Sequence, residues 1–198
     1  ELAQNVSAST PIDDPNRDPF IDIAYSDYHD YIVEAARLGI VYGHTDGRFR
    51  PDDPTSRAQF VTMLWRMAGE PKCDAKLKFT DSDSIDAVYR DAVAWGQEKG
   101  IVLGYDDNTF RPDETVSRAQ MAAFLYRYLK TVAGYDFGAF GDAGYADAAD
   151  IKDCYTEAVN AITAAGIMKG TGGNMFSPNE DASRAMVATV LVRMAKLY

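Results

Sequence analysis

Apolar residues recur at helical spacing near the start of the chain. They fall three or four residues apart, at Tyr28, Tyr31, Ile32, Ala35 and Leu38. This spacing places them on one face and predicts a helix across residues 28–38. Gly39 follows directly, and glycine commonly ends a helix because it adopts a left-handed conformation without strain.

A second helix is predicted further along, and its start carries a clear signal. Ser56 and Gln59 form an S-x-x-Q pattern, in which each side chain can satisfy a backbone N–H group of the other residue. Apolar positions then recur at helical spacing from Phe60 onward. Between the two helices, a short apolar pair, a turn at 45–47 and Phe49 predict a small extended hairpin.

This helix–loop–helix pattern occurs three times. The second helices open with Ser-Arg-Ala at 56–58, 117–119 and 183–185. Other landmarks keep their distance from that motif in every copy: Gly43, Gly104 and Gly170, then Phe49, Phe110 and Phe176, and also Tyr28, Tyr89 and Tyr155. An F-x-D motif opens each copy and aligns Asp22, Asp81 and Asp142. The chain is therefore read as three repeats of one unit.

The repetition predicts the architecture. A unit of about 60 residues with two helices cannot easily bury both of its helices alone. We therefore expect one all-α domain, in which the three repeats pack with pseudo-threefold symmetry and leave three grooves between neighbours. The expected boundaries are an extended lead-in at 1–19 and repeats at 20–70, 79–131 and 140–198.

An arginine opens each second helix, where a cation is unexpected. The N-terminus is the positive end of the helix dipole, so a cation there costs from a few tenths up to about 1 kcal/mol. Arg57, Arg118 and Arg184 would tolerate this cost if an anion bound them together with the unpaired N–H groups of the helix start. The alternative is structural: each arginine pairs with an internal acid such as Asp22 or its counterparts.

Composition narrows the partners and the chemistry. The net charge is −10, which argues against nucleic acid, because phosphate binding needs a clustered basic surface. No apolar run is long enough to span a membrane. The two cysteines, Cys73 and Cys154, either form a disulfide or are inert thiols. Two cysteines and two histidines without a CxxC pair do not indicate a zinc site. We expect no cofactor and no metal.

The ordered motifs resemble the S-layer homology (SLH) domain. They are F-x-D, a tyrosine-containing helix, G-I-x-x-G, F-x-P and Ser-Arg-Ala-Gln, where the family usually has Thr-Arg-Ala-Glu. In the third copy Met186 replaces the glutamine, which removes half of the capping pair. The resemblance implies a three-pronged spindle around a central helical bundle. It also implies a non-catalytic, extracellular module that anchors exported proteins to the bacterial cell wall.

The resemblance also implies a ligand, namely a secondary cell-wall polysaccharide that often carries a pyruvate ketal, or peptidoglycan in some lineages. The planar carboxylate of such a ketal suits a guanidinium group. The expected ligand-binding residues are Arg57, Arg118, Arg184, Asp22, Asp81, Asp142, Gly43, Gly104, Gly170, His44 and Tyr105. The three aspartates have a structural alternative as caps, and the three glycines either admit a sugar or take a positive φ. The first two grooves are expected to be the better sites.

Other functions are less consistent with the sequence. No catalytic triad, phosphate-binding loop or dinucleotide motif is present, so we expect no enzyme. The oxygen ligands of the loop at 44–53 do not fall at EF-hand positions. Lateral assembly into a surface lattice remains an alternative to glycan binding. A lattice former would self-associate with rising concentration, whereas an isolated binding module is expected to be a monomer.

Overall fold

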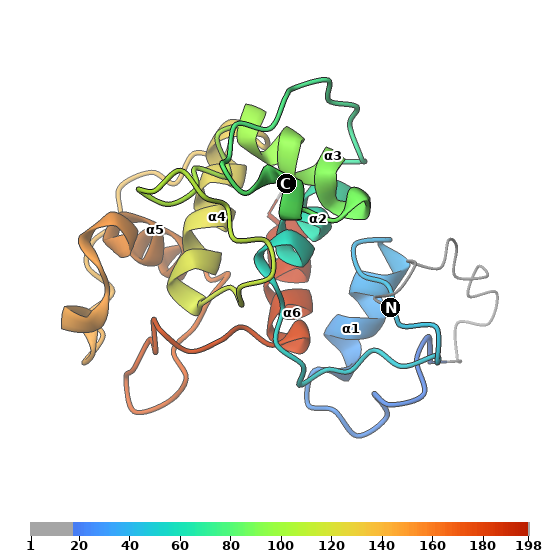
Figure 1. The fold of residues 1–198 in the computed structure, drawn as a ribbon. Coiled ribbons are helices and arrows are strands. Elements are labelled where there is room, and N and C mark those ends of the chain that lie inside the picture. The colour runs from blue at the N-terminus through green and yellow to red at the C-terminus, as the bar shows by residue number, and fades with distance from the viewer. Residues whose placement is uncertain (1–17, 198) are drawn as a thin grey trace.

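The computed structural model describes residues 18–197, and within this range it contains six α-helices and no β-strand. In chain order the helices are α1 (His29–Arg37), α2 (Arg57–Met67), α3 (Ala87–Glu98), α4 (Arg118–Thr131), α5 (Asp153–Ala164) and α6 (Arg184–Ala195). Two short 3-10 helices, η1 (Ser82–Ser84) and η2 (Ala148–Asp150), precede α3 and α5. The predicted mainly helical fold is confirmed (Figure 1). Nearly all of the expected lead-in at 1–19 lies outside the described residues.

The predicted helix ends are present. Ser56 with Gln59, and Ser117 with Gln120, form complete capping boxes at the starts of α2 and α4. Ser183 retains its half of the pattern and accepts a hydrogen bond from the Met186 amide at 3.3 Å. The first helix of every repeat ends at a glycine with φ near +70°, in a double hydrogen-bond pattern known as the Schellman motif. These ends follow from local sequence alone.

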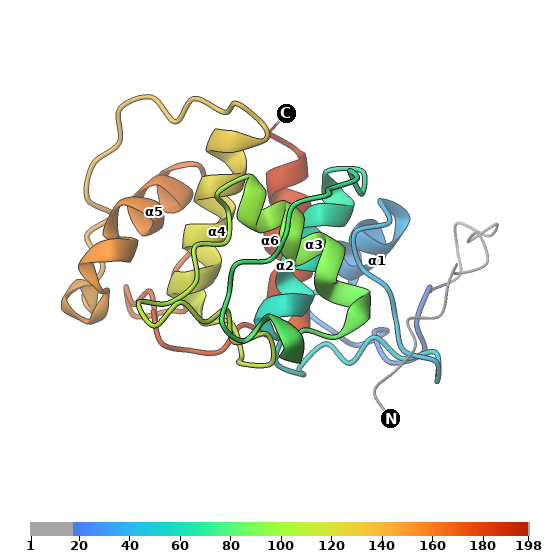
Figure 2. The ribbon, with the colours of Figure 1, turned by 45° about the horizontal axis from the view of Figure 1, so that its top comes forward.

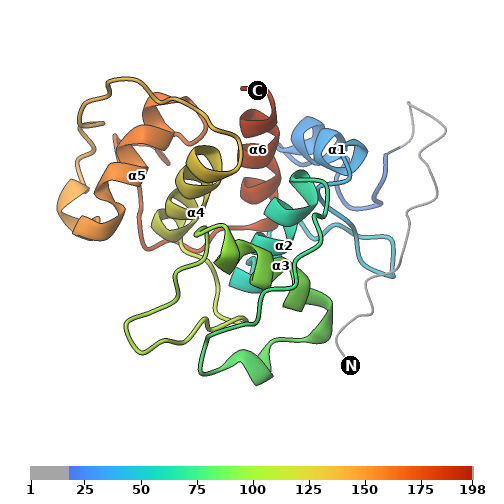
Figure 3. The same ribbon diagram turned by 90° about the horizontal axis from the view of Figure 1, so that it is seen from above.

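The close helix pairs form between repeats. α2 packs against α3, α4 against α5, and α6 against α1. Each second helix therefore contacts the first helix of the next repeat, and the last repeat returns to the first. Figure 3 shows α2, α4 and α6 toward the middle of the molecule, with α1, α3 and α5 outside them, and Figure 2 shows the same grouping from another side. The pairing closes the three repeats into a ring.

A cycle of backbone hydrogen bonds joins the three repeats just before their second helices. The Thr55 amide donates to the Ala182 carbonyl at 2.9 Å, the Val116 amide to the Thr55 carbonyl at 3.0 Å, and the Ala182 amide to the Val116 carbonyl at 2.9 Å. Each residue occupies the same position in its own repeat. The pseudo-threefold relation is therefore present in the hydrogen bonding as well as in the sequence.

The core is continuous through all three repeats. Its largest fully buried side chains include Phe49, Phe110 and Phe176, one from each repeat. Trp95 is also fully buried and meets Tyr128 edge to face at 6.2 Å between ring centroids. Each such side chain contributes roughly 1.5–3 kcal/mol through burial.

The predicted extended hairpin between the two helices of each repeat is wrong in one respect. The chain does turn back, because the His44 amide donates to the Arg48 carbonyl at 2.7 Å and the Tyr105 amide to the Thr109 carbonyl at 2.9 Å. No strands flank these turns, and only an isolated bridge between Gly172 and Met175 occurs in the third repeat. The segments are too short to form a strand ladder.

The start of the third repeat lies five residues later than the F-x-D motif suggested. Tyr145 packs against Phe176 in a tilted arrangement, as Phe20 does against Phe49, with ring centroids 5.3 Å and 5.2 Å apart. The carboxylate that corresponds to Asp22 and Asp81 belongs to Asp147. The apparent match of Phe140-Gly-Asp142 arises because that linker contains a similar short motif.

Asp142 therefore does not occupy the position predicted for it. Its carboxylate accepts a local hydrogen bond from the Gly144 amide. Asp147 accepts the amides of Phe176 and Ser177 at 2.8 and 2.7 Å. Burial by itself raises the pKa of the Asp147 carboxyl, but these amide donors outweigh it and hold the pKa below its ordinary value.

Candidate functional site

The three arginines that open α2, α4 and α6 are buried. Arg57 is 4% exposed, and Arg118 and Arg184 are each 6% exposed. Each Nε donates across a repeat boundary to the carbonyl of a buried phenylalanine at 2.8 Å. The acceptors are Phe110 for Arg57, Phe176 for Arg118 and Phe49 for Arg184. Every arginine thus joins two repeats at one of the three boundaries between them.

The helix-start N–H groups are not free to bind an anion, so this part of the prediction is wrong. The Arg57 amide donates to the Glu114 carbonyl at 2.9 Å and the Ala58 amide to the Pro112 carbonyl at 3.0 Å. The Gln59 amide is taken by the Ser56 hydroxyl. The same bonds recur at α4 and α6. An anion in a groove would therefore meet the guanidinium group and not the helix N-terminus.

The alternative prediction, an ion pair with the repeat-opening aspartates, is also wrong. Asp22 accepts the amides of Phe49 and Arg50, each at 2.8 Å. Asp81 accepts the amides of Phe110 and Arg111 at 2.8 and 2.7 Å. These carboxylates hold the turn before the proline that recurs in each repeat, at Pro51 and Pro112, and do not hold a helix end. Their role is structural, but they do not act as helix caps.

The three guanidinium groups differ in how fully the protein uses them. Arg118 Nη2 donates to the Lys169 carbonyl and Arg184 Nη2 to the Tyr42 carbonyl, each at 2.8 Å. Arg57 has no such bond from its terminal nitrogens to any described residue, and its one side-chain hydrogen bond within residues 18–197 is through Nε. Arg57 consequently keeps donors available for a ligand.

An open pocket lies beside Arg57. It has about 340 Å³ of free space, continuous with solvent, and residues of all three repeats line it. Its lining residues are Arg57, Leu103, Gly104, Tyr105, Gln120, Ala123, Phe124, Arg127 and Tyr155. Arg57, Gln120 and the Tyr105 hydroxyl are polar, whereas Leu103, Ala123 and Phe124 are apolar. The pocket thus combines a cation with a wall that suits a methyl group or the face of a sugar ring.

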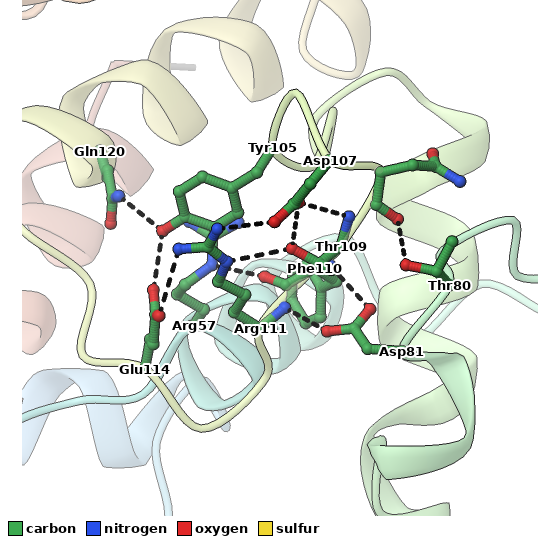
Figure 4. A network of polar contacts seen from close by, with 11 residues as sticks. Arg57, Thr80, Asp81, Tyr105, Asp107, Thr109, Phe110, Arg111, Glu114 and Gln120 are labelled. Atoms are coloured by element: carbon green, nitrogen blue, oxygen red, sulfur yellow. Dashed lines mark hydrogen bonds and ion pairs between the residues drawn. The ribbon is translucent and has the colours of Figure 1, made fainter.

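Tyr105 organises the polar side of this pocket (Figure 4). Its ring lies between two guanidinium groups, with Arg57 Cζ 4.7 Å and Arg111 Cζ 4.0 Å from the ring centroid. Its hydroxyl donates to Glu114 and accepts from Gln120 Nε2, both at 3.0 Å. Burial raises the pKa of Tyr105 despite the opposing charge of Arg57, so the hydroxyl remains neutral.

Burial also acts on the arginines themselves. Loss of water lowers the pKa of Arg57 and of Arg118, and it lowers that of Arg184 to about 10. All three remain charged near neutral pH. Within 4 Å, the sole carboxylate contact to the three groups in residues 18–197 is Glu180 to Arg118, at 4.0 Å. A carboxylate ligand at Arg57 would therefore compensate a charge that the described residues contact through a carbonyl group and aromatic faces and with no carboxylate.

The three loop glycines are required by close packing. A Cβ at Gly43 would lie 2.5 Å from the Phe20 ring, and at Gly104 it would lie 2.7 Å from the Phe79 ring. At Gly170 the obstacle is the Met175 carbonyl at 2.7 Å. Of the three, Gly104 alone has a positive φ, +76°. The alternative that they simply take a positive φ thus holds for Gly104 alone.

The residue after this glycine differs between the three repeats. Tyr105 lines the pocket beside Arg57, and Thr171 and His44 occupy the corresponding positions of the third and first repeats. The Thr171 hydroxyl bonds to Ser177 Oγ at 2.7 Å. The Nε2 atom of His44 is buried and has no hydrogen-bond partner. The structure therefore brings the predicted residues His44 and Tyr105 to matching positions with different surroundings.

Several pocket residues were not predicted from the sequence as ligand-binding. Tyr155 was recognised as a recurring tyrosine, and Gln120 as a helix cap, but neither was assigned to a groove. Arg127 lines the pocket and donates to the Ile101 carbonyl at 3.2 Å, so it also has a structural role. Their recurrence at fixed distances from Ser-Arg-Ala was the available signal. What it could not show is that Tyr155 reaches a groove formed by the two other repeats.

The other residues considered for metal binding or a disulfide, in the described part of the chain, bond to nearby protein groups. Asp46, in the loop considered for calcium, accepts the Arg48 amide and pairs with Arg50 Nη2 at 3.0 Å. Cys73 and Cys154 are free thiols, and Cys73 Sγ donates to Glu98 at 2.9 Å. Across residues 18–197 no helix is both long enough and apolar enough to cross a bilayer.

Comparison with known proteins gives the same three-part division. The family model described as "S-layer homology domain" matches residues 19–61, 78–122 and 144–186. The third match begins next to Tyr145, in agreement with the structural register. Among the similar proteins, an amylopullulanase of Thermoanaerobacterium thermosulfurigenes is 28% identical over 172 residues, which is 87% of this chain and 9% of that protein.

Two further relatives are surface proteins by name. A surface-layer 125 kDa protein of Lysinibacillus sphaericus is 29% identical over 78% of this chain and 13% of its own length. A cellulosome-anchoring protein of Acetivibrio thermocellus is 30% identical over 50% of this chain and 22% of its own length. The chain spans less than a quarter of each of these relatives. With the family model covering the helix–loop–helix core of all three repeats, the chain belongs to the S-layer homology domain family.

Proposed function

We propose that this chain is a non-catalytic anchoring module that binds a secondary cell-wall polysaccharide in its inter-repeat grooves. Its role would be to tether an exported protein to the bacterial surface. The polysaccharide would carry a carboxylate, as a pyruvate ketal does. The observation that carries this proposal is the Arg57 guanidinium, which is buried, charged and without a carboxylate partner, and whose terminal nitrogens adjoin an open pocket.

Membership of the family supports the anchoring role. The relatives include proteins named as surface-layer and cellulosome-anchoring, and enzymes in which this chain matches only a small part of the length. A shared module in proteins of such different kinds favours attachment rather than catalysis. Among the described residues, the pocket beside Arg57 also contains no pair of carboxylates arranged for hydrolysis.

The pocket chemistry supports an acidic sugar as the ligand. The guanidinium group can bind a planar carboxylate with two parallel hydrogen bonds, and such a contact contributes about 1.5–3 kcal/mol. Exposed Leu103 and the neighbouring apolar residues suit the methyl group of a ketal. The chain and the polymer are both acidic, so attraction depends on local contacts. If several inter-repeat grooves bind the same polymer chain, the overall affinity exceeds that of a single groove, because later contacts form within one complex.

The test is a pull-down with purified cell-wall sacculi before and after acid extraction of the secondary polymer. We expect binding to intact sacculi and its loss after extraction. Binding that survives extraction would place the ligand on peptidoglycan instead. No binding to either, together with self-association in sedimentation at rising concentration, would favour a lattice-forming role.

A matched pair of variants tests the role of the groove. Arg57→Lys keeps the charge but removes the planar arrangement of donors, and should weaken retention on intact sacculi. Arg37→Ala, at an exposed position on α1, should bind like the unmodified chain. Equal binding of the Arg57 variant, with an unchanged circular dichroism spectrum, would contradict the proposed site.

A further inference from the structure

An acidic residue of the neighbouring repeat adjoins each helix-opening arginine. The backbone amide of every such arginine donates to the carbonyl of this acid at 2.9 Å, in the pairs Arg57–Glu114, Arg118–Glu180 and Arg184–Asp53. Because this backbone bond is the same at all three boundaries, the acidic side chain starts from the same place relative to the arginine. The direction of that side chain therefore decides whether the arginine meets a carboxylate of the protein itself.

At the Arg118 boundary the acidic side chain turns toward the arginine. The Glu180 Oε2 atom lies 4.0 Å from Arg118 Nε. Burial lowers the pKa of Arg118, and the Glu180 charge opposes this effect. Thr171 and Ser177, the neighbouring polar residues of this loop, bond to each other at 2.7 Å. Among the described residues, no side chain donates a hydrogen bond that holds the Glu180 carboxylate in another direction.

At the Arg57 boundary the equivalent carboxylate is held elsewhere. The Tyr105 hydroxyl donates to Glu114 Oε2 at 3.0 Å. Arg111 Nη1 donates to the other oxygen, Oε1, at 3.4 Å (Figure 4). Both carboxylate oxygens of Glu114 are thus engaged by its own loop. Within residues 18–197 the terminal nitrogens of Arg57 consequently have no protein partner, and they adjoin the open pocket.

Two substitutions between the repeats account for this difference. Ser177 and Thr171 occupy the positions of Arg111 and Tyr105. The backbone is not the cause, because Arg111 and Ser177 have the same φ of +57°. Serine lacks the length and charge of arginine, and threonine lacks the phenol. The acid is therefore restrained only where the longer side chains are present.

We propose that Arg111 is a positioning residue: together with Tyr105 it holds the Glu114 carboxylate away from Arg57 and so keeps that guanidinium group open to a carboxylate ligand. Glu114 is the internal competitor, because a carboxylate of the protein and one of the ligand use the same donors. The Arg118 boundary is the contrasting arrangement, in which the protein supplies the carboxylate. This inference rests on the proposed function and adds a control on the same pocket.

The first test is Arg111→Ser, which introduces the residue of the third repeat at a position with the same φ. The freed Glu114 side chain should turn to Arg57. The probe is a methyl glycoside bearing a 4,6-linked pyruvate ketal, titrated calorimetrically into the whole chain. We expect its affinity to fall about twofold to fivefold, because a partly exposed ion pair must break before the probe binds. The matched control is Arg50→Ser at the corresponding position of the first repeat, where the arginine pairs with Asp46.

The double variant Arg111→Ser/Glu114→Gln separates positioning from charge. If Arg111 acted only through its own charge, Glu114→Gln would change the affinity equally with and without Arg111. We expect Glu114→Gln to restore the affinity in the Arg111→Ser chain and to have a much smaller effect alone. Additive effects across the four proteins would overturn the inference. Tyr105→Phe, which removes the other donor, allows the same cycle with Glu114→Gln if Arg111→Ser does not fold.

A measurement without ligand separates this inference from the function on which it rests. Arginine-selective ¹³C and ¹⁵N labelling reports the guanidinium signals of Arg57 in the free chain. We expect these signals to shift in Arg111→Ser and to return in the double variant. Unchanged signals would overturn the inference, whatever the probe does. If the signals shift and return but none of the proteins binds the probe, the positioning role stands and the proposed binding of a pyruvylated polysaccharide fails.

Discussion

The repeat boundaries at Arg57 and Arg184 are built from equivalent positions and differ in which polar groups are left without a partner. In the first, Tyr105 satisfies its neighbours and the arginine keeps free terminal donors. In the second, the arginine donates twice to backbone carbonyls, and His44 retains an unpaired nitrogen. The same repeat unit therefore produces one boundary where the cation adjoins an open pocket and another where two backbone carbonyls occupy it. Three copies of a motif need not be three copies of a site.

The largest expected effect is on stability, from Arg184→Ala. This change removes two bonds that join the third repeat to the first and leaves the Phe49 and Tyr42 carbonyls without their donor. We expect a loss of about 3–5 kcal/mol in the free energy of unfolding, measured by urea denaturation. Arg57→Ala removes one such bond and should cost roughly half as much. Equal losses would show that the two arginines are structurally equivalent.

The second effect is on binding, where we expect the Arg57 substitution to matter more than the Arg184 substitution. Arg57→Ala should weaken affinity for a pyruvate-ketal glycoside by about tenfold to a hundredfold at its own groove, since a charge-assisted contact is lost. Isothermal titration with the folded variant measures this change. Arg48→Ala, at an exposed position outside the pocket, provides the control. If the Arg57 variant binds as tightly as the control, the guanidinium group of Arg57 does not contact the ligand.

A smaller effect distinguishes the two residues that follow the loop glycine. Tyr105→Phe removes a hydroxyl that bonds to Gln120 and Glu114, so it should lower stability by about 0.5–1.5 kcal/mol. His44→Phe removes an atom that is already unpaired, and should leave stability unchanged or raised. Thermal unfolding of the two variants beside the unmodified chain measures both changes in stability. A loss in His44→Phe as large as in Tyr105→Phe would mean that the ring nitrogen is satisfied in solution.

The smallest effect is the dependence of stability on pH. Burial, and then the charges of Arg184 and Arg50, lower the pKa of His44 below 6.5, against the opposing influence of Asp46 and Asp53. The His44 ring therefore binds a proton more readily in the unfolded chain than in the folded one. The free energy of unfolding consequently decreases as pH falls below about 6.5. His44→Gln should flatten that slope in urea unfolding between about pH 5 and 7.

His29 provides the contrasting case. Its hydrogen bonds to Asp30 and Asp18 raise its pKa above 6.5. Its contribution is therefore complete below about pH 6.5 and is lost as pH rises through the folded pKa. His29→Gln should change the slope in the opposite direction. If both variants leave the profile unaltered, neither histidine is coupled to folding.

The sequence predicted the local elements well because their causes are local. Ser56 and Gln59 lie three residues apart on one chain segment, and a capping box needs nothing else. The glycines that end the first helices follow the same logic. The register of the third repeat was wrong because Phe140 and Asp142 imitate the motif in the adjacent linker, whereas Tyr145 and Asp147 take the structural positions. A short motif does not reveal which of two candidates packs against Phe176.

By itself, the sequence determined the number of repeats, the helical class, the helix boundaries and the arginine that opens each second helix. Only the tertiary structure decided what those arginines bond to, because their partners lie in the next repeat. It also decided that the helix-start amides are occupied by carbonyls of that neighbour, and that His44 is unpaired where Tyr105 is satisfied. The reason is physical: the periodicity of apolar residues and helix caps depends on neighbours a few positions away, whereas the pocket beside Arg57 is lined by residues of all three repeats. Which side-chain donors and acceptors stay unpaired is therefore settled only when the three repeats have packed into a ring.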